Sequence, residues 1–124
     1  MEGFERVWDP TGFAIDAKEF DGLDPLVAWT LHCAREALRD CVRDNGARTG
    51  AVFGNLGFPS AGMAAFAQSV WTGEGHADAR NRFMAAGTAD LLRRALALDA
   101  GSHCLDAACA SSLYAIKLAC DRLQ

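Results

Sequence analysis

Residues 106–120 read DAACASSLYAIKLAC, in which small residues surround Cys109 and an amphipathic segment follows. The stretch SHCLDAA at residues 102–108 predicts a short strand, and residues 110–123 predict a helix. The face that we expect this helix to bury carries Leu113, Ile116, Cys120 and Leu123. Cys109 is therefore expected at a junction between a strand and a helix.

Upstream of this junction the sequence predicts a helix and a second strand. Asp24-Pro25 marks the start of the helix, because Asp is a good N-cap and Pro is tolerated in the first turn. Apolar residues recur with helical spacing as far as Asn45-Gly46, which we expect to end the helix. The apolar run GAVFGN at residues 50–55 predicts a buried strand, and turn formers at residues 57–62 predict a loop.

Two further helical segments separate the predicted strands. The Ala-rich residues 61–72 predict the first, and a turn-rich break follows at residues 72–78. Residues 79–98 predict the second, in one or two pieces, with an interruption near Gly87 and with Thr88 as a candidate cap of the second piece. Because strands and helices alternate along the chain, we expect an α/β fold.

The composition indicates one soluble globular domain spanning residues 1–124. Apolar residues make up 51% of the 124 and charged residues 23%, which is usual for such a domain. The net charge of -4 and the scattered charges argue against nucleic acid as a partner. The sequence shows neither a run of 18 apolar residues nor the features of a signal peptide, so we expect no membrane association and a cytoplasmic location.

The five cysteines are odd in number, and none falls in a C-x-x-C pair. This pattern argues against both a disulfide framework and a metal site. We therefore expect reduced thiols and no bound metal.

The position of Cys109 favours a reactive thiol. The first amides of a helix have no partners within the helix, and its dipole stabilises a thiolate placed at its start. The same amides can hold the oxyanion that forms when sulfur attacks a carbonyl, as in a nucleophile elbow. The alternative, from position alone, is a buried cysteine in a turn of small residues, because free Cys is among the most buried residue types.

The same stretch resembles the active-site segment of the β-ketoacyl synthases, in which Asp-Thr-Ala-Cys-Ser-Ser-Ser-Leu leads into a helix. Cys109 matches the nucleophilic cysteine of that pattern, and Asp106 matches the Asp three residues before it. Ser111, Ser112 and Leu113 match the residues that follow. This chain departs from the pattern at residues 107 and 110, where Ala replaces Thr and Ser.

Other segments extend the resemblance in the family's order. Residues 13–40 are similar to its Asp-Pro segment and long helix, and TGAVFGN at 49–55 is similar to the strand that follows. The loop GNLGFPS at 54–60 resembles that of polyketide-type and polyunsaturated-fatty-acid-type synthases. The resemblance implies a thiolase-like α/β fold, of which this chain would be an incomplete N-terminal half.

The resemblance also implies a reaction. The cysteine accepts an acyl chain as a thioester, and a malonyl unit on an acyl carrier protein is decarboxylated to a carbanion that attacks the thioester. Two histidines assist, and the backbone N–H of the cysteine contributes to the oxyanion hole. No directly bound cofactor is implied, because the substrates are carried on the phosphopantetheine arm of the acyl carrier protein.

The histidines of this chain do not match those of the family. His32, His76 and His103 all precede Cys109, outside the expected sequence contexts. We therefore assign a catalytic role to Cys109 alone, and we expect the chain to be a fragment that lacks both histidine motifs.

The remaining candidates have simpler structural interpretations. We expect His103 to be structural or exposed rather than a base for Cys109, and Cys104 to be a core residue of its strand. Asn55, together with Gly54 and Gly57, is interpreted as a plain turn rather than a pocket border. The other cysteines, which we expect to act as small apolar residues in helices, are Cys33, Cys41 and Cys120.

The N-terminal part has two further features. Residues 1–22 lack periodicity and predict an irregular lead-in, whose Trp8, Phe13 and Phe20 are interpreted as packing anchors. The mixed charges at residues 35–44 predict a solvated helix face supported by i,i+4 pairs.

Two hypotheses about function follow. In the first, the chain is part of an acyl-thioester condensing enzyme of fatty acid or polyketide biosynthesis, with an acyl carrier protein as partner. In the second, it is a non-catalytic remnant that pairs with a partner chain, either as a homodimer or with a complementary ketosynthase half, because uncovered sheet edges and helix faces invite association.

Overall fold

A computed structural model describes residues 3–41, 48–56, 60–75 and 77–124. The helices and strands, in chain order, are α1 (Pro25–Arg39), β1 (Ala51–Gly54), α2 (Ala61–Thr72), α3 (Met84–Ala95), β2 (Ser102–Leu105) and α4 (Ser111–Arg122). Short 3-10 turns form η1 (Phe4–Arg6), η2 (Ala17–Phe20), η3 (Ala79–Phe83) and η4 (Ala108–Ala110).

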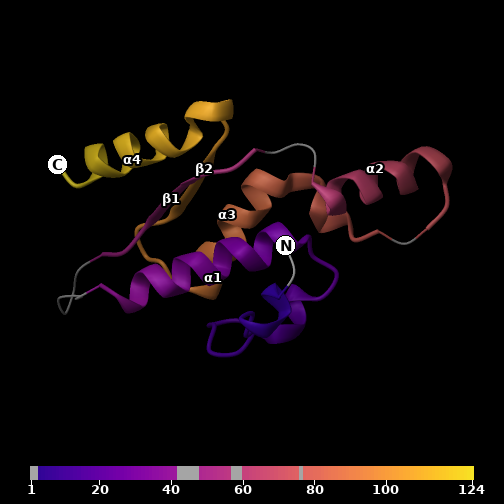
Figure 1. Cartoon of the computed structure of the whole chain (residues 1–124), viewed down its shortest axis with the longest axis horizontal. Helices are drawn as coiled ribbons and strands as arrows, with labels where there is room; N and C mark the ends of the chain where they lie inside the picture. Colours follow the sequence, from indigo (N-terminus) through magenta and orange to yellow (C-terminus); the bar gives the residue numbers. More distant parts are fainter. Residues whose placement is uncertain (1–2, 42–47, 57–59, 76) are drawn as a thin grey trace.

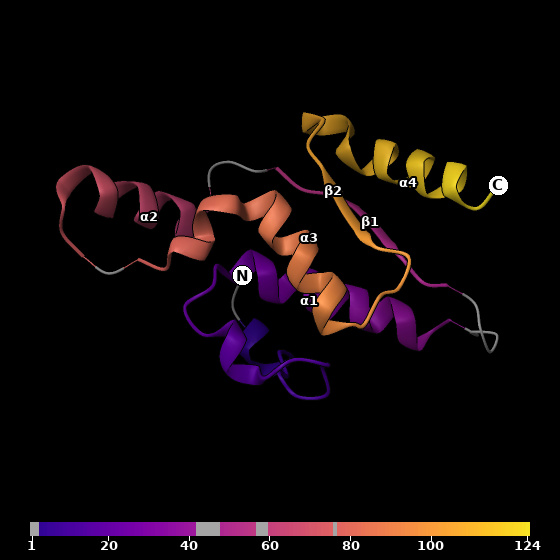
Figure 2. The same ribbon diagram turned by 180° about the vertical axis from the view of Figure 1, so that it is seen from behind.

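The two strands lie side by side and run parallel. Ala51 of β1 pairs with Ser102 of β2, and Gly54 pairs with Leu105. α4 covers one face of this pair, and α1 and α3 lie on the opposite face (Figures 1 and 2). α2 extends away from these layers and packs beside η3 (Figure 1). The layers confirm the predicted α/β class.

The core lies mainly between α1 and α3. Leu31 of α1 and Leu92 of α3 are the largest fully buried side chains, with 0% and 1% of their surface exposed. Burying such a side chain stabilises the fold by about 2 kcal/mol. The buried cluster consists of Val27, Leu31, Met84, Leu91, Leu92, Ala95 and Leu98.

α1 begins as predicted and ends early. Asp24 Oδ1 accepts a hydrogen bond from the Leu26 N–H at 2.8 Å, which confirms Asp24 as the N-cap. The helix ends at Arg39 rather than near Asn45-Gly46, so its predicted length was wrong. The Asn45-Gly46 pair itself lies outside the described residues.

The loop after β1 is shorter than predicted. Residues 57–59 lie outside the described part, whereas residues 61–62 already belong to α2. α2 begins after Ser60, whose hydroxyl oxygen accepts a hydrogen bond from the Met63 N–H at 3.2 Å, and its bounds agree with the prediction. Because Ser60 is a good N-cap, α2 begins at Ala61 and includes the last two residues of the expected loop.

The interruption in the 79–98 segment is at a different place from the one predicted. Helix α3 starts at Met84 and runs without a break through Gly87 and Thr88, so the segment divides where η3 gives way to α3 rather than at Gly87. Thr88 is not a cap, because its buried hydroxyl donates to the Met84 carbonyl one turn earlier. Asp78 caps the first piece instead, by accepting from the Arg80 N–H at 2.8 Å.

The buried face of α4 is the opposite of the one predicted. Leu113, Ile116 and Leu123 are 70%, 61% and 88% exposed, and Cys120 is also exposed. The buried residues are Ser111 and Ala115. The side chains of α4 that face the strands are small because the helix lies too close to β1 for larger side chains. Ser111 of α4 lies directly against Gly54 of β1.

The N-terminal lead-in packs against the core, as predicted for its aromatic residues. The ring centroids of Trp8 and Phe13 lie 5.8 Å apart, and those of Phe13 and Phe20 lie 5.4 Å apart. Arg35 departs from the predicted solvated face, because its guanidinium donates to the Asp9 carbonyl at 2.8 Å and lies 4.7 Å from the Phe13 ring. In the described part of that face Arg39 pairs with Glu36 at the i,i+3 spacing, at 2.9 Å, and residues 42–44 of the face lie outside the described residues.

Candidate active site around Cys109

Cys109 lies in η4, between the end of β2 and the start of α4. Its side chain is exposed, so the alternative of a buried cysteine is wrong. β2 ends at Leu105 rather than at the predicted Ala108, and the intervening residues form the turn that presents the thiol. The structure therefore confirms that Cys109 is in a strand-to-helix junction.

The turn contains a residue in a sparsely populated backbone conformation. Ala108, immediately before Cys109, has a φ of 48°, which is in the left-handed region. A residue with a Cβ atom adopts this region at a cost of about 1 kcal/mol. Such strain persists only where the surroundings enforce it, and it clusters at functional sites.

Two side chains from the matched motif hold this turn. The Asp106 Oδ1 atom accepts a hydrogen bond from the Ala108 N–H at 3.0 Å. The Ser111 hydroxyl accepts from the Ala107 N–H at 2.9 Å and donates to the Ala108 carbonyl at 2.7 Å. The peptide groups on both sides of the strained residue are thus fixed by Asp106 and Ser111.

Gly54 brings β1 against the same turn. A Cβ atom on Gly54 would lie 2.6 Å from the Ser111 Cβ and 2.7 Å from the Ser111 carbonyl carbon. Real Cβ atoms essentially never show such distances, so this position requires glycine. The contact between Gly54 and Ser111 was not predicted from the sequence. Its only local signals are a glycine at the end of β1 and a small residue at the start of α4.

The other candidates lie away from Cys109 or are less accessible. His103 is exposed near the start of β2, as predicted, and its ring lies near Gly101. His32 on α1 packs edge-on against Phe4, and His76 is outside the described residues. Cys104 is only half-buried rather than a full core residue, and burial raises the pKa of its thiol.

The remaining cysteines do not pack as the sequence predicted, and Asn55 is part of the strand pairing. Cys33, Cys41 and Cys120 are exposed, so their predicted role as apolar packing residues is wrong. The Asn55 N–H donates to the Leu105 carbonyl at 3.0 Å, which extends the strand pairing by one residue. Gly57 of the predicted turn lies outside the described part.

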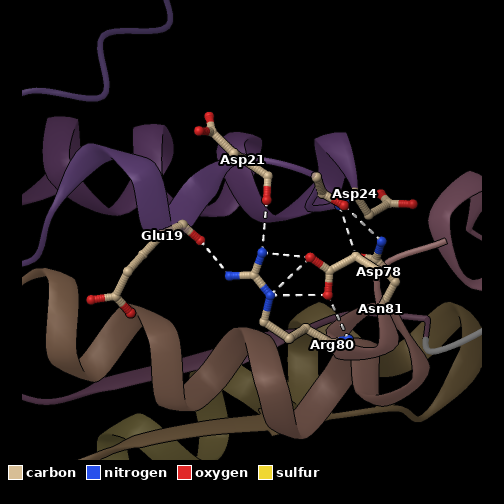
Figure 3. A network of polar contacts seen from close by, with 7 residues as sticks. Glu19, Asp21, Asp24, Asp78, Arg80 and Asn81 are labelled. Carbon is tan, nitrogen blue, oxygen red and sulfur yellow. Dashed lines mark hydrogen bonds and ion pairs between the residues drawn. The ribbon is translucent and has the colours of Figure 1, made fainter. Parts of the chain in front are cut away.

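A second polar network lies where α1, α2 and η3 meet (Figure 3). Buried Asp24 accepts hydrogen bonds from Leu26 and, through its other oxygen, from the Gly62 N–H, while its own N–H donates to Asn81 at 2.9 Å. Beside it, Arg80 donates to the carbonyl oxygens of Glu19 and Asp21, both at 2.7 Å. The polar groups of this network bond to one another, which indicates a structural role.

Two classes of site are not seen in the described part of the chain. Within residues 3–41, 48–56, 60–75 and 77–124, no group of three or more His, Cys, Asp or Glu side chains is arranged to hold a metal ion. In the same ranges no helix has the length and apolar character needed to cross a bilayer.

The comparisons with known proteins agree with the geometry of the junction. No curated protein and no solved structure matches the chain significantly. The family described as β-ketoacyl synthase, N-terminal domain, matches residues 2–124. The match therefore includes Cys109, the turn that holds it and both strands. On this evidence the chain belongs to the β-ketoacyl synthase N-terminal domain family, a family of condensing enzymes.

Proposed function

We propose that this chain supplies the acyl-accepting nucleophile of a condensing enzyme of fatty acid or polyketide biosynthesis, and that Cys109 is that nucleophile. One observation carries the proposal: an exposed thiol follows a strained residue in a turn that is fixed by Asp106 and Ser111. A fixed turn of this kind holds the sulfur in one orientation toward an incoming carbonyl.

In the proposed first step, Cys109 loses its proton and its sulfur attacks the carbonyl carbon of an acyl thioester on an acyl carrier protein. The bond between that carbon and the carrier's sulfur breaks, and the carrier's thiol takes up a proton. The acyl chain remains on Cys109 as a new thioester. The backbone N–H of Cys109 is the expected donor to the oxyanion, as the resemblance implies, because the N–H groups of Ala110 and Ser111 already donate to the carbonyls of Ala107 and Ala108.

In the second step, loss of CO₂ from a carrier-bound malonyl unit leaves a carbanion that attacks this thioester and releases the Cys109 thiolate. The histidines expected to assist are not supplied by the described residues near Cys109. His32 packs against Phe4 on α1, and His103 lies near the opposite end of β2. We therefore propose that this chain, by itself, accepts the acyl group without completing the condensation.

Limited alkylation tests the nucleophile. The chain offers its own matched controls, because Cys33 and Cys120 are exposed like Cys109, whereas Cys104 is half-buried. We expect a limiting amount of iodoacetamide, followed by peptide mass mapping, to label Cys109 several-fold faster than Cys33 or Cys120. Equal labelling of Cys33, Cys109 and Cys120 would refute the assignment.

An acyl thioester tests the reaction itself. Incubation with an acyl-N-acetylcysteamine thioester is expected to add one acyl mass to the wild-type chain and to Cys120→Ala, and none to Cys109→Ala. Acylation that persists in Cys109→Ala would place the nucleophile elsewhere.

A specific observation favours a second candidate, a non-catalytic subunit that pairs with a partner chain. The apolar side chains of Leu113, Ile116 and Leu123 point away from the strands, and α2 buries none of its residues. Large exposed apolar surfaces are typical of association sites. Light scattering after size-exclusion chromatography separates the candidates: a monomer at all concentrations contradicts self-pairing, whereas a dimer with unreactive Cys109 favours this second function.

A further inference from the structure

A surface cavity of about 520 Å³ lies between the strands and the C-terminal part of α4, at the end of that helix away from Cys109. Three basic side chains line it, and they come from three separate segments. Arg48 precedes β1, His103 is in β2, and Arg122 is in the last turn of α4. No Asp or Glu is among the described residues that line the cavity.

The two arginines differ from most others in the described part of the chain. Arg39, Arg80 and Arg94 each form an ion pair with an acid of this chain. Arg48 and Arg122 form none within the described residues.

The acid beside this cavity is already engaged. Asp99 accepts a hydrogen bond from the Thr49 N–H at 2.7 Å. That bond, and more weakly the charge of Arg48, lowers the pKa of Asp99. Because the chain as a whole has a net charge of -4, the positive cavity does not reflect a general excess of basic residues.

We propose that this cavity binds a phosphate group, held by Arg48 and Arg122 with His103 as a further donor. Guanidinium groups offer paired N–H donors that match the oxygens of a phosphate. The volume exceeds that of the phosphate group alone and lies within the range of small-molecule sites, so an organic phosphate also fits. This site is separate from Cys109 and does not depend on the proposed nucleophile.

A simpler role exists for one of the three residues. A cation in the last turn of a helix stabilises the negative end of its dipole, and Arg122 occupies that position in α4. If this were its whole role, Arg122→Gln would lower stability and leave phosphate binding unchanged. The affinity for phosphate, rather than stability, therefore distinguishes the two roles.

The test is a titration of the full chain, followed by ¹H–¹⁵N NMR at constant ionic strength. The probes are inorganic phosphate, 4′-phosphopantetheine and pantetheine, which lacks the phosphate. We expect saturable shifts of the amides of Gly50, Gly101 and Ala119 with both phosphate compounds and none with pantetheine. Tighter binding of 4′-phosphopantetheine than of inorganic phosphate would identify the organic ligand as the source of the group.

Substitutions of arginines inside and outside the cavity lining complete the test. The double variant Arg48→Gln/Arg122→Gln is expected to weaken phosphate binding by about tenfold or more, because charge-assisted hydrogen bonds are the strong ones. Arg93→Gln removes one charge from α3, outside the residues that line the cavity, and is expected to leave the affinity unchanged. Non-saturable shifts, equal weakening by Arg93→Gln, or full affinity in the double variant would each overturn the proposal.

Discussion

The turn at Cys109 and the corner at Asp24 are both held by polar side chains, and they differ in what those side chains leave free. At the corner, the two oxygens of buried Asp24 accept hydrogen bonds from Leu26 and Gly62. At the turn, the side chains fix the backbone around Ala108 and leave the thiol of Cys109 exposed. A network whose polar groups bond to one another indicates a structural role, whereas a fixed turn that leaves one thiol exposed supports the proposed site.

Each region contains a glycine in close contact with another segment, Gly62 at the corner and Gly54 at the turn, but the atoms that they contact differ. A Cβ atom on Gly62 would meet the side-chain oxygen of Asp24 at 2.8 Å, whereas one on Gly54 would meet the Ser111 backbone at 2.7 Å. A side chain can move aside more readily than the backbone of a helix start. The Cys109 turn is therefore the less tolerant of the two, and the following predictions probe this difference.

The largest effect is expected for Gly54→Ala. The added methyl group would collide with Ser111 and force α4 away from β1, at a cost of about 3 kcal/mol in the free energy of unfolding. Urea unfolding followed by circular dichroism measures it. Gly87→Ala is the control, because its Cβ would lie 3.7 Å or more from its neighbours in α3, and there alanine should stabilise the helix slightly.

A smaller loss is expected for Asp24→Ala. This change removes the N-cap of α1 and leaves the buried Gly62 N–H without its acceptor, which should cost about 2 kcal/mol. Urea unfolding again provides the measurement. Asp16→Ala removes a comparable cap from exposed η2, and an equal loss in both variants would mean that burial adds nothing at Asp24.

Ser111→Ala should separate stability from reactivity. It removes both hydrogen bonds of the hydroxyl, with Ala107 and Ala108, for a loss of about 1 kcal/mol. Because the turn is then free to relax, we expect slower alkylation of Cys109, measured by mass mapping against Cys120 as the internal reference. Ser112→Ala, at the exposed neighbouring position, should change neither quantity.

The smallest effect concerns pH at the second network. The hydrogen bonds from Arg80, together with its charge, lower the pKa of Asp78. The resulting stability is present above the ordinary aspartate pKa of about 3.9 and is lost as pH falls through the lowered value. Both partners are partly exposed, so we expect a contribution below about 1 kcal/mol.

Thermal unfolding at pH 7 and at pH 3 measures this contribution. The decrease in midpoint on acidification should be smaller in Arg80→Gln than in the wild-type chain, because Asp78 then loses its charged partner. An identical decrease in both proteins would contradict the role given to this pair.

Local signals in the sequence predicted the elements better than their contacts. Asp24-Pro25 marked the start of α1, and the apolar run around Val52 marked β1, because caps and strand patterns act over a few residues. The buried face of α4 was predicted wrongly from its large apolar residues. Its true face depends on Gly54, which is distant in the chain, and on how closely the helix approaches that strand.

The candidate site was predictable to a similar degree. The small residues around Cys109 and the matched motif were sufficient to place the thiol at a strand-to-helix junction. The hydrogen bonds of Ser111 were not predicted, because they depend on the left-handed backbone at Ala108, and alanine gives no local signal for that conformation.

The parallel pairing of β1 with β2 also sets an order for folding. Ala51 pairs with Ser102, so β1 and β2 cannot pair until the ribosome has synthesised α2, α3 and the start of β2. Pairing across such a sequence separation requires closure of a long loop before any contact compensates for the lost entropy. During synthesis β1 therefore lacks its partner β2 until residue 102 has been added. We expect the contact between Gly54 and Ser111, which supports the Cys109 turn, to form late in folding.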